Sequence, residues 1–429
     1  MKRCSIATRA SSLKPWARCL VLSLASLAAG AQVLEPLITE AVSAHPATQS
    51  AQSQQASARA GLASARWQYW PTPSVLVETA GTSATDSAYQ GDQRVATLRL
   101  QQPLWTGGRL SAGLSRADAG LAYSQASLHE VRQQLALRVV QAYGDWLAAQ
   151  FKTASHLKTR AIHEELQARV KRRVEQGISA ESDLVLTDVR LQSLAAELSI
   201  ARLQQDTALA RLGQLLGRPV LGDELAVAAP RPVDPAWLSQ LEGVLAAQPA
   251  VQKAQAQARL QEAGVAERRA ELSPEVYLRA ERQYGNYAIR NAVPENRLFV
   301  GLSTRLGAGL STLTNVEAAQ AQQQAALADV QVQRRAAAEQ LLADHAQASS
   351  SDPRLAALEA SLKAAQAVCL SYDRQFLAGR KSWLDVMNAQ RELAQTELAL
   401  VDLQASQVVV TWRLALNTLG LEAVTGVRP

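Results

Sequence analysis

The spacing of apolar residues along this chain switches between a period of about 3.6, typical of helices, and a period of two, typical of strands. The period of two is clear at residues 96–101, 276–281 and 298–303, and weaker at residues 74–80. Most of the remaining chain has the helical period. The pattern therefore predicts a mainly helical protein with four short strands.

Two of the helical stretches are much longer than the others. One runs from Arg109 to about Gln176 and the other from Leu310 to Phe376. At a rise of about 1.5 Å per residue, each would be about 100 Å long, which no compact globular domain can hold. Residues 349–353 are expected to kink or restart the second stretch, because Pro353 lacks a backbone donor and Ser or Asp can cap a new start.

A glycine closes each long stretch, Gly177 in the first and Gly379 in the second. Glycine readily takes the left-handed conformation that ends helices. After each glycine a few polar residues turn the chain, and an aspartate, Asp183 or Asp385, falls in the first turn of the next helix, where the helix dipole favours an anion. We therefore expect two helical hairpins with tips at residues 177–183 and 379–388.

The chain is a tandem duplication. Residues 51–71 return about 200 positions later as residues 254–274. The identical pairs include Gly61/Gly264, Arg66/Arg269 and Pro71/Pro274. We assign a first repeat to 32–218, a proline-rich linker to 219–236, a second repeat to 237–421 and a C-terminal tail to 422–429. Each repeat is predicted to contain a helix, two strands, a very long helix, a tip and a returning helix.

The first 31 residues have the composition of a cleaved signal peptide. Basic residues precede an apolar run from Cys19 to Ala29, and Ala29-Gly30-Ala31 suits signal peptidase. Five of the 44 Lys and Arg residues lie in this leader, so the mature chain, with 38 Asp and Glu, is close to neutral and gives no reason to expect nucleic acid. Cys369 alone remains after cleavage, and we expect it to be a small core residue.

Strands of about ten residues with one apolar face suit an outer membrane. Four strands cannot close a barrel, and lipid does not tolerate open edges, so we expect three chains to share a twelve-stranded barrel. After the leader, no apolar run approaches the roughly 18 residues that a membrane-spanning helix needs. The alternative is a soluble periplasmic coiled-coil scaffold that carries the strands as hairpins.

This order of elements resembles the TolC-like outer-membrane factors, also called the outer membrane efflux protein family, over essentially the whole mature chain. The motifs that carry the resemblance are the doubled helix-Pro-strand arms, the segment 102–108 (QPLWTGG), the two tips, and the closing pairs Leu216-Gly217 and Leu419-Gly420. The resemblance implies a homotrimeric channel in the outer membrane of a Gram-negative bacterium, in contact with outer-membrane lipid, with a helical tunnel through the periplasm. It also implies two partners: a periplasmic adaptor (membrane fusion protein) and an inner-membrane ABC transporter or proton-driven antiporter.

The resemblance assigns a periplasmic gate to the tips. Lys381 corresponds to the basic bridging residue of the family, with Ser182 and Asp183 as its partners on the other hairpin. Phe376 stands where a bridging tyrosine is found in the family, and it cannot donate a hydrogen bond. We therefore expect the closed state to be held more loosely than in relatives with the tyrosine.

The resemblance also implies a constriction ring just inside the gate. Asp385 keeps the acidic charge of that ring, and Asn388 is only polar. The positions that correspond to adaptor docking are Gly177, Ile178, Gly379 and Arg380.

The sequence contains no catalytic or cofactor-binding constellation, and we expect no enzyme activity and no cofactor. The histidines are His45, His129, His156, His163 and His345. No two of them stand three or four residues apart, so none suggests a metal pair on a helix, and each is expected to be a solvated helix residue. Residues 379–382 lack the glycine-rich lead-in of a phosphate loop, and Met387 has no methionine neighbours that would suggest soft-metal export.

Two segments, 305–311 and 383–391, resemble the branch of the family that serves type I secretion of large adhesins. We therefore expect a passive exit duct for a protein substrate. The alternative is the outer-membrane component of a multidrug or small-molecule efflux pump.

Overall fold

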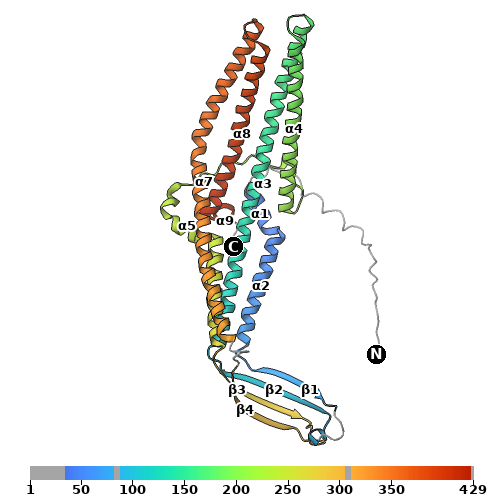
Figure 1. The fold of residues 1–429 in the computed structure, drawn as a ribbon, viewed down its shortest axis with the longest axis vertical. Coiled ribbons are helices and arrows are strands. Elements are labelled where there is room, and N and C mark those ends of the chain that lie inside the picture. Colours follow the sequence, from blue (N-terminus) through green and yellow to red (C-terminus); the bar gives the residue numbers. More distant parts are fainter. Residues whose placement is uncertain (1–33, 82–86, 305–310, 427–429) are drawn as a thin grey trace, which may run out of the picture.

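The computed structural model describes residues 34–81, 87–304 and 311–426 of the chain. A four-stranded sheet lies at one end of an elongated molecule and the two hairpin tips lie at the other (Figure 1). The expected signal peptide lies outside the described residues, as do residues 305–310 and 427–429. Over the described residues, no helix combines the length and apolarity that crossing a membrane requires.

Two unbroken helices run the length of the helical part. They are α3 (Arg109–Glu175) and α7 (Ser311–Leu377), each of 67 residues. The shorter α-helices are α1 (Leu34–Ala44), α2 (Pro46–Trp67), α4 (Glu181–Leu216), α5 (Leu241–Ala247), α6 (Pro249–Ala270), α8 (Trp383–Leu419) and α9 (Leu421–Thr425). Three 3-10 turns are η1 (Ser87–Tyr89), η2 (Gly222–Glu224) and η3 (Pro235–Gln240). Helix α3 packs against α2 and α6 toward the sheet and against α4 and α8 toward the tips (Figure 1).

The restart expected at residues 349–353 is wrong, because α7 continues through Pro353 without interruption. Packing on α8 holds the segment in the helix. Gln407 of α8 donates to the Asp352 carboxylate at 2.6 Å, and Gln347 donates to the Ser406 hydroxyl at 3.0 Å. The Ser351 hydroxyl donates back to the Gln347 carbonyl at 2.8 Å. Tertiary contacts thus override a local tendency that would break an isolated helix.

The sheet joins the two repeats in the order β1-β2-β3-β4, with every pair antiparallel. Its strands are β1 (Thr72–Thr79), β2 (Arg94–Trp105), β3 (Glu275–Tyr284) and β4 (Glu295–Ser303). Strand β2 was expected to end at Pro103, but it continues to Trp105 through a register shift between these two residues. Strands β1 and β4 form the edges, and the described part of the protomer leaves the outer edge of each unpaired.

The main hydrophobic core lies at the middle of the helical part, which we call the waist. Its largest members come from α3 and α8: Tyr143 is 0% exposed, Trp146 2% and Trp412 4%. The linker between the repeats is fastened to this core. The Tyr143 hydroxyl donates to the Ala226 carbonyl at 2.5 Å, and the Trp412 indole donates to the Ala229 carbonyl at 3.0 Å. The linker is thus part of the waist rather than a loose connection.

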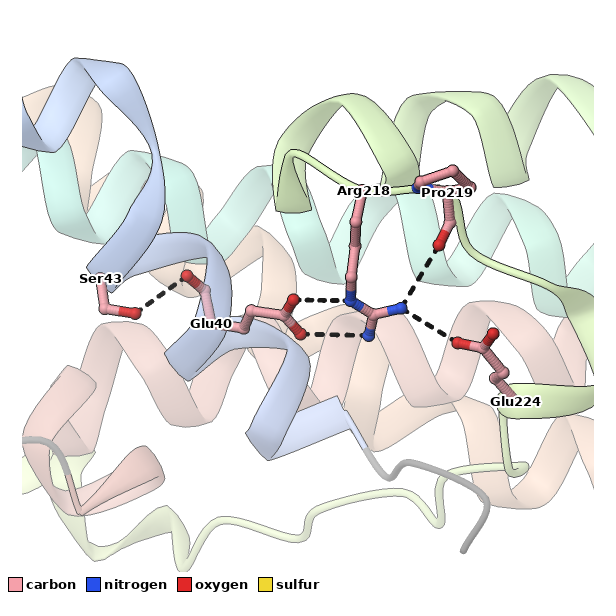
Figure 2. Close-up of polar contacts among 5 residues, drawn as sticks. All are labelled: Glu40, Ser43, Arg218, Pro219 and Glu224. Atoms are coloured by element: carbon pink, nitrogen blue, oxygen red, sulfur yellow. Dashed lines mark hydrogen bonds and ion pairs between the residues drawn. The ribbon is translucent and has the colours of Figure 1, made fainter. Parts of the chain in front are cut away.

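An arginine just after α4 ties the first helix to the linker (Figure 2). The Arg218 guanidinium donates to both carboxylate oxygens of Glu40, at 2.7 and 3.2 Å, and to Glu224 at 3.0 Å. The hydrogen bonds to Glu40 have the largest effect and those to Glu224 the next largest, and together they raise the pKa of Arg218 above its usual value. Helix α1, the end of α4 and the linker are therefore joined through one side chain.

Candidate functional site: hairpin tips and membrane strands

Both tips end their first helix with the same backbone motif. In the first tip, the Ile178 amide donates to the Arg173 carbonyl at 2.8 Å and the Gly177 amide to the Val174 carbonyl at 2.9 Å. In the second tip, the Arg380 amide donates to the Gln375 carbonyl at 2.8 Å and the Gly379 amide to the Phe376 carbonyl at 3.0 Å. This is the Schellman arrangement, which requires a left-handed residue, and Gly177 and Gly379 have φ of 71° and 70°.

The second helix of each hairpin begins differently. In the second tip, the Ser382 hydroxyl accepts the Asp385 amide at 3.1 Å, and the Asp385 carboxylate accepts the Ser382 amide at 3.1 Å. Hydrogen bonds from Ser382, reinforced by the charge of Lys381, lower the pKa of Asp385. In the first tip, Ala180 occupies the cap position and offers no side-chain acceptor. The second tip therefore has a complete capping box that the first tip lacks.

A buried cluster joins the two hairpins within one protomer. Its members are Leu166, Val170, Phe376, Trp383, Val386 and Met387. Trp383, from the start of α8, is 2% exposed, and its indole donates to the hydroxyl of Thr187 on α4 at 3.0 Å. Nearby, one guanidinium nitrogen of Arg169 donates to both carboxylate oxygens of Asp373, at 2.6 and 2.7 Å. The sequence did not predict either of these contacts.

The predicted gate residues do not bond one another within a protomer. Phe376 is 5% exposed, with its ring 5.0 Å from that of Trp383 and 4.8 Å from the guanidinium carbon of Arg173. The ammonium of Lys381 lies 4.5 Å from the ring centroid of Tyr372, and no ion pair joins Lys381 to Asp183 in the described protomer. Within this protomer, Lys381 therefore contacts Tyr372 rather than its predicted partners.

The predicted docking residues form an exposed surface at the end of the molecule. Gly177, Ile178, Gly379 and Arg380 are all exposed, and Ile178 has 60% of its surface accessible. Of the predicted constriction residues, Asn388 is exposed and Asp385 is half-buried in its cap. The geometry thus leaves the predicted docking positions accessible to a partner, and the predicted constriction positions lie on the first turns of α8.

Two histidines were wrongly expected to be solvated. His156 is 8% exposed and His163 is 4% exposed, and both line a groove of about 560 Å³ between α3, α4 and α8. The His163 ring forms a hydrogen bond with the Thr159 carbonyl at 2.9 Å. Burial lowers the pKa of His163; the charge of Arg190 adds to this effect, and the bond to Thr159 opposes it. Cys369 is 5% exposed, so its expected burial is confirmed. Among the described residues, no group of three or more His, Cys, Asp or Glu side chains could hold a metal ion.

The sheet has one apolar and one polar face. The apolar face carries residues that are 43 to 73% exposed: Val75, Val77, Leu98, Leu100, Leu298, Val300 and Leu302. On the opposite face, Arg99 and Glu281 are paired across β2 and β3, with 2.6 Å between the guanidinium and the carboxylate. A sheet with a broad exposed apolar face and a charged reverse face is typical of strands that separate lipid from a water-filled lumen.

Comparisons with known proteins agree with this geometry. A family model described as "Outer membrane efflux protein" matches residues 37–218 and 241–417 as two segments. The alkaline protease secretion protein AprF of Pseudomonas aeruginosa is 27% identical over 339 residues, which cover 75% of this chain and 68% of AprF.

Solved structures share the fold. The outer membrane protein VceC of Vibrio cholerae has a TM-score of 0.78 at 17% identity and covers 90% of this chain and 96% of its own. The MtrE outer membrane channel of Neisseria gonorrhoeae, solved in an open state, has a TM-score of 0.74 at 18% identity, with 91% of this chain and 90% of MtrE covered.

These matches confirm the fold class, the outer-membrane location with extension into the periplasm, and the absence of an enzymatic role. The alternative of a soluble periplasmic scaffold is therefore wrong. Members of the family are trimeric channels that work with a periplasmic adaptor and an inner-membrane transporter. Because the family model covers most of the chain, the protein belongs to the outer membrane efflux protein family and is an export channel of the TolC type.

Proposed function

We propose that three copies of this chain close a twelve-stranded barrel, with the outer edge of β4 of one protomer paired to β1 of the next. The unpaired edges of β1 and β4 support this proposal, because open strand edges are not tolerated in lipid. The exposed apolar face of the sheet would then contact outer-membrane lipid, and the face carrying Arg99 and Glu281 would line the lumen.

We further propose that this trimer is the passive exit duct for type I secretion of a protein substrate. The observation that carries the proposal is the similarity to AprF, a protease secretion protein, over three quarters of the chain. The residues at 383–391, which suggested the branch for large adhesins, form the start of α8, close in sequence to Lys381 of the predicted gate. A large adhesin is the narrower form of the proposal, and a secreted protease is its nearest competitor.

Export of small molecules is the second candidate function. The outer membrane efflux family and the fold shared with channels such as VceC and MtrE favour it. In that case the inner-membrane partner would be a proton-driven antiporter rather than an ABC transporter. A neighbouring gene for an ABC transporter would favour secretion of a protein, and one for a proton-driven antiporter would favour export of small molecules.

At the tips, we propose that Lys381 pairs with Ser182 and Asp183 of a neighbouring hairpin to hold the entrance closed, next to Phe376. Asp385 and Asn388 would line the constriction. The exposed surface of Gly177, Ile178, Gly379 and Arg380 would receive the periplasmic adaptor. An adaptor opens the gate only if it binds the open arrangement better than the closed one, since a partner shifts an equilibrium by its differential affinity.

The test is deletion of the gene in its native host, with complementation by the wild-type chain. We expect one or a few proteins to disappear from the culture medium and to return on complementation, while drug susceptibility stays unchanged. Mass spectrometry of the medium identifies the substrate, and its size and domain composition distinguish an adhesin from a protease. An unchanged set of secreted proteins combined with increased drug susceptibility would instead establish small-molecule efflux.

A further inference from the structure

The arginines on the polar face of the sheet have partners within the protein. Arg99 and Arg279 lie 2.6 and 3.0 Å from the Glu281 carboxylate. Arg297 lies 2.6 Å from the Glu295 carboxylate. The strand register places all of these side chains on the same face. Each arginine of this face therefore has a counter-charge close by.

Two arginines on the apolar face have no such partner. Arg282 pairs in register with Leu98, on the face that carries the exposed leucines and valines. Arg94 stands four residues before Leu98 in β2, so the alternation of side chains places it on the same face. Both arginines are exposed, and neither forms an ion pair with a described residue. The strand positions of this face hold no Asp or Glu, so any counter-charge must come from outside the described protomer.

Both arginines lie toward the end of the sheet that points away from the helices (Figure 1). The apolar band of this face begins near the helices at Val276 and ends at Arg282, six residues further along β3. At about 3.3 Å per residue, this is roughly 20 Å of strand. The strand positions at the helix end of the same face hold no charged residue. Because the helices extend into the periplasm, the two positive charges lie toward the outer leaflet of the membrane.

An apolar hollow borders Arg282 on its membrane side. The hollow has a volume of about 450 Å³, and its lining on this face includes Leu98, Leu100, Ala280 and Leu298. The guanidinium carbon of Arg282 lies 5.3 Å from the ring centroid of Tyr284, which stands next to it on the same face. A charged head and an apolar slot are thus adjacent. This arrangement suits a ligand that joins an anionic group to an acyl chain.

The acidic residue closest in sequence to Arg94 is engaged elsewhere. The Asp92 carboxylate accepts the backbone amides of Asn291 at 2.8 Å and of Asn286 at 3.1 Å, both in the loop between β3 and β4. The cation whose charge acts on Asp92 is Arg290 of that loop. Arg94 is therefore left to bind an external anion.

We propose that Arg94, Arg282 and the hollow, together called the rim site, bind a lipopolysaccharide molecule of the outer leaflet. Arg94 stands about 13 Å along the strand from the level of Arg282. The disaccharide of lipopolysaccharide carries a phosphate at each end and acyl chains beneath, so it can meet both arginines at once. Guanidinium groups bind phosphate through paired N–H donors. The proposal rests on the proposed barrel, in which this face contacts lipid, and each protomer carries a complete site.

The test is titration of the full-length trimer, purified in detergent, with fluorescently labelled rough lipopolysaccharide. We expect saturable binding of one molecule per protomer. Arg94→Gln and Arg282→Gln should each raise the dissociation constant about tenfold, because each removes charge-assisted hydrogen bonds to a phosphate. Arg282→Lys keeps the charge and should retain part of the affinity.

Arg297→Gln serves as the matched control. Arg297 is an exposed arginine that pairs in register with Glu281, the neighbour of Arg282, but on the polar face. Its replacement should leave the dissociation constant unchanged. Lipopolysaccharide stripped of its phosphates should bind the wild-type trimer about as weakly as the intact form binds the two glutamine variants. Equal binding with and without phosphates would overturn the proposal, and so would an equally large loss of affinity in Arg297→Gln.

Phosphatidylglycerol provides the competing source of phosphate. It should displace labelled lipopolysaccharide only at much higher concentration, because it has one phosphate for two arginines. Displacement at equal concentration would mean that the site takes phospholipid and would overturn the proposal. Trimer formation in gels reports on the barrel separately. Trimers that bind no lipopolysaccharide would overturn this proposal alone, whereas a chain that forms no trimers would overturn the proposed barrel with it.

Discussion

The tip between α3 and α4 and the tip between α7 and α8 end their first helix with the same motif and begin their second helix with different caps. The second tip has the Ser382–Asp385 capping box and contributes Trp383, which reaches across to the first hairpin. The first tip has Ala180 at the cap, and Thr187 in its second helix accepts the bond from Trp383. The second tip therefore has the better-fixed helix start, and Trp383 joins it to the first hairpin.

The largest expected effect comes from removing the contact between the hairpins. Trp383→Ala deletes a buried ring, which typically costs about 3 to 5 kcal/mol in a core. Hydrogen exchange should speed up in both tips, because the first hairpin loses its main contact with the second. Trp383→Phe keeps a ring but loses the bond to Thr187, and should cost only about 1 kcal/mol. If Trp383→Ala leaves exchange in the first tip unchanged, the hairpins are not coupled in this way.

Acid should loosen the first hairpin before the second. The pKa of His163 is lowered in the folded chain, so its contribution to stability is complete above the unfolded value near 6.5 and is lost as pH falls below it, by at most about 1.4 kcal/mol per pH unit. The charged residues lining the same groove are Lys152, Arg190, Glu197, Arg391 and Asp402. The lowered pKa of Asp385 keeps the cap of the second tip intact until far more acidic conditions.

The acid effect can be measured by hydrogen exchange in both hairpins at about pH 7.5 and about pH 5.5. Exchange should rise in α3 and α4 and stay nearly constant at the start of α8. His163→Gln should remove most of the difference, whereas His129→Gln, at an exposed position of α3, should retain it. An equal pH dependence of exchange in the His163→Gln and His129→Gln variants would exclude His163 as the cause.

Exchanging the caps should make the two tips more similar in stability. Ser382→Ala removes the cap of α8 and should destabilise the second tip by about 1 kcal/mol. Ala180→Ser places a hydroxyl at a residue whose backbone, with φ −74° and ψ 150°, already suits a cap, three residues before Asp183. This change should stabilise the first tip by a similar amount. Local hydrogen exchange should slow at the start of α4 in Ala180→Ser and speed up at the start of α8 in Ser382→Ala. A change in the reverse direction at either position would contradict the assignment of its cap.

The smallest individual effects are expected at the proposed gate between protomers. An exposed Lys381–Asp183 pair contributes only about 0.2 to 1 kcal/mol, although threefold symmetry repeats it. Lys381→Glu or Asp183→Lys should raise single-channel conductance in planar bilayers, and the double exchange should partly restore closure. Wild-type conductance in both single variants would show that Lys381 and Asp183 do not form the gate.

The proposed ring of Asp385 side chains can be tested with Asp385→Ala, and the cap variant Ser382→Ala serves as the control. Asp385→Ala should abolish most of the block by multivalent cations, because it removes three like charges at the constriction. Ser382→Ala disturbs the same cap but keeps the charges, so its block should persist. Loss of block in both variants would assign the effect to the fold of the tip rather than to the charge.

The sequence predicted the elements well because their signals are local. The prolines before the strands, the glycines at the tips and the change of period are each readable within a few residues. The burial of His156 and His163 was also readable, since with Thr159, Leu166 and Val170 they form a stripe at alternating spacings of three and four. That stripe marks the face of α3 that packs against its neighbours, and it shows that spacing among histidines alone was the wrong criterion.

Other features could not be predicted because they depend on how distant elements meet. The Trp383–Thr187 bond requires the rotation of two helices about their own axes, and no local pattern gives that. Pro353 stays helical because α8 packs beside it, and the bulge at the end of β2 depends on the register with β3. The roles of Lys381, Asp183 and Asp385 depend on neighbouring protomers and stay predictions.

The packed waist also sets how finely the entrance can be adjusted. From Trp146 to Gly177, α3 projects roughly 47 Å beyond the waist core, so a tilt of about one degree there displaces the tip by roughly 0.8 Å. A small change in helix angle at the waist is therefore amplified into a measurable displacement of the entrance. Tyr143 and Trp412, which hydrogen-bond to the linker, and Trp146, which packs against Tyr143, therefore affect the entrance from a distance. How tightly these side chains pack limits how small an opening step the channel can make.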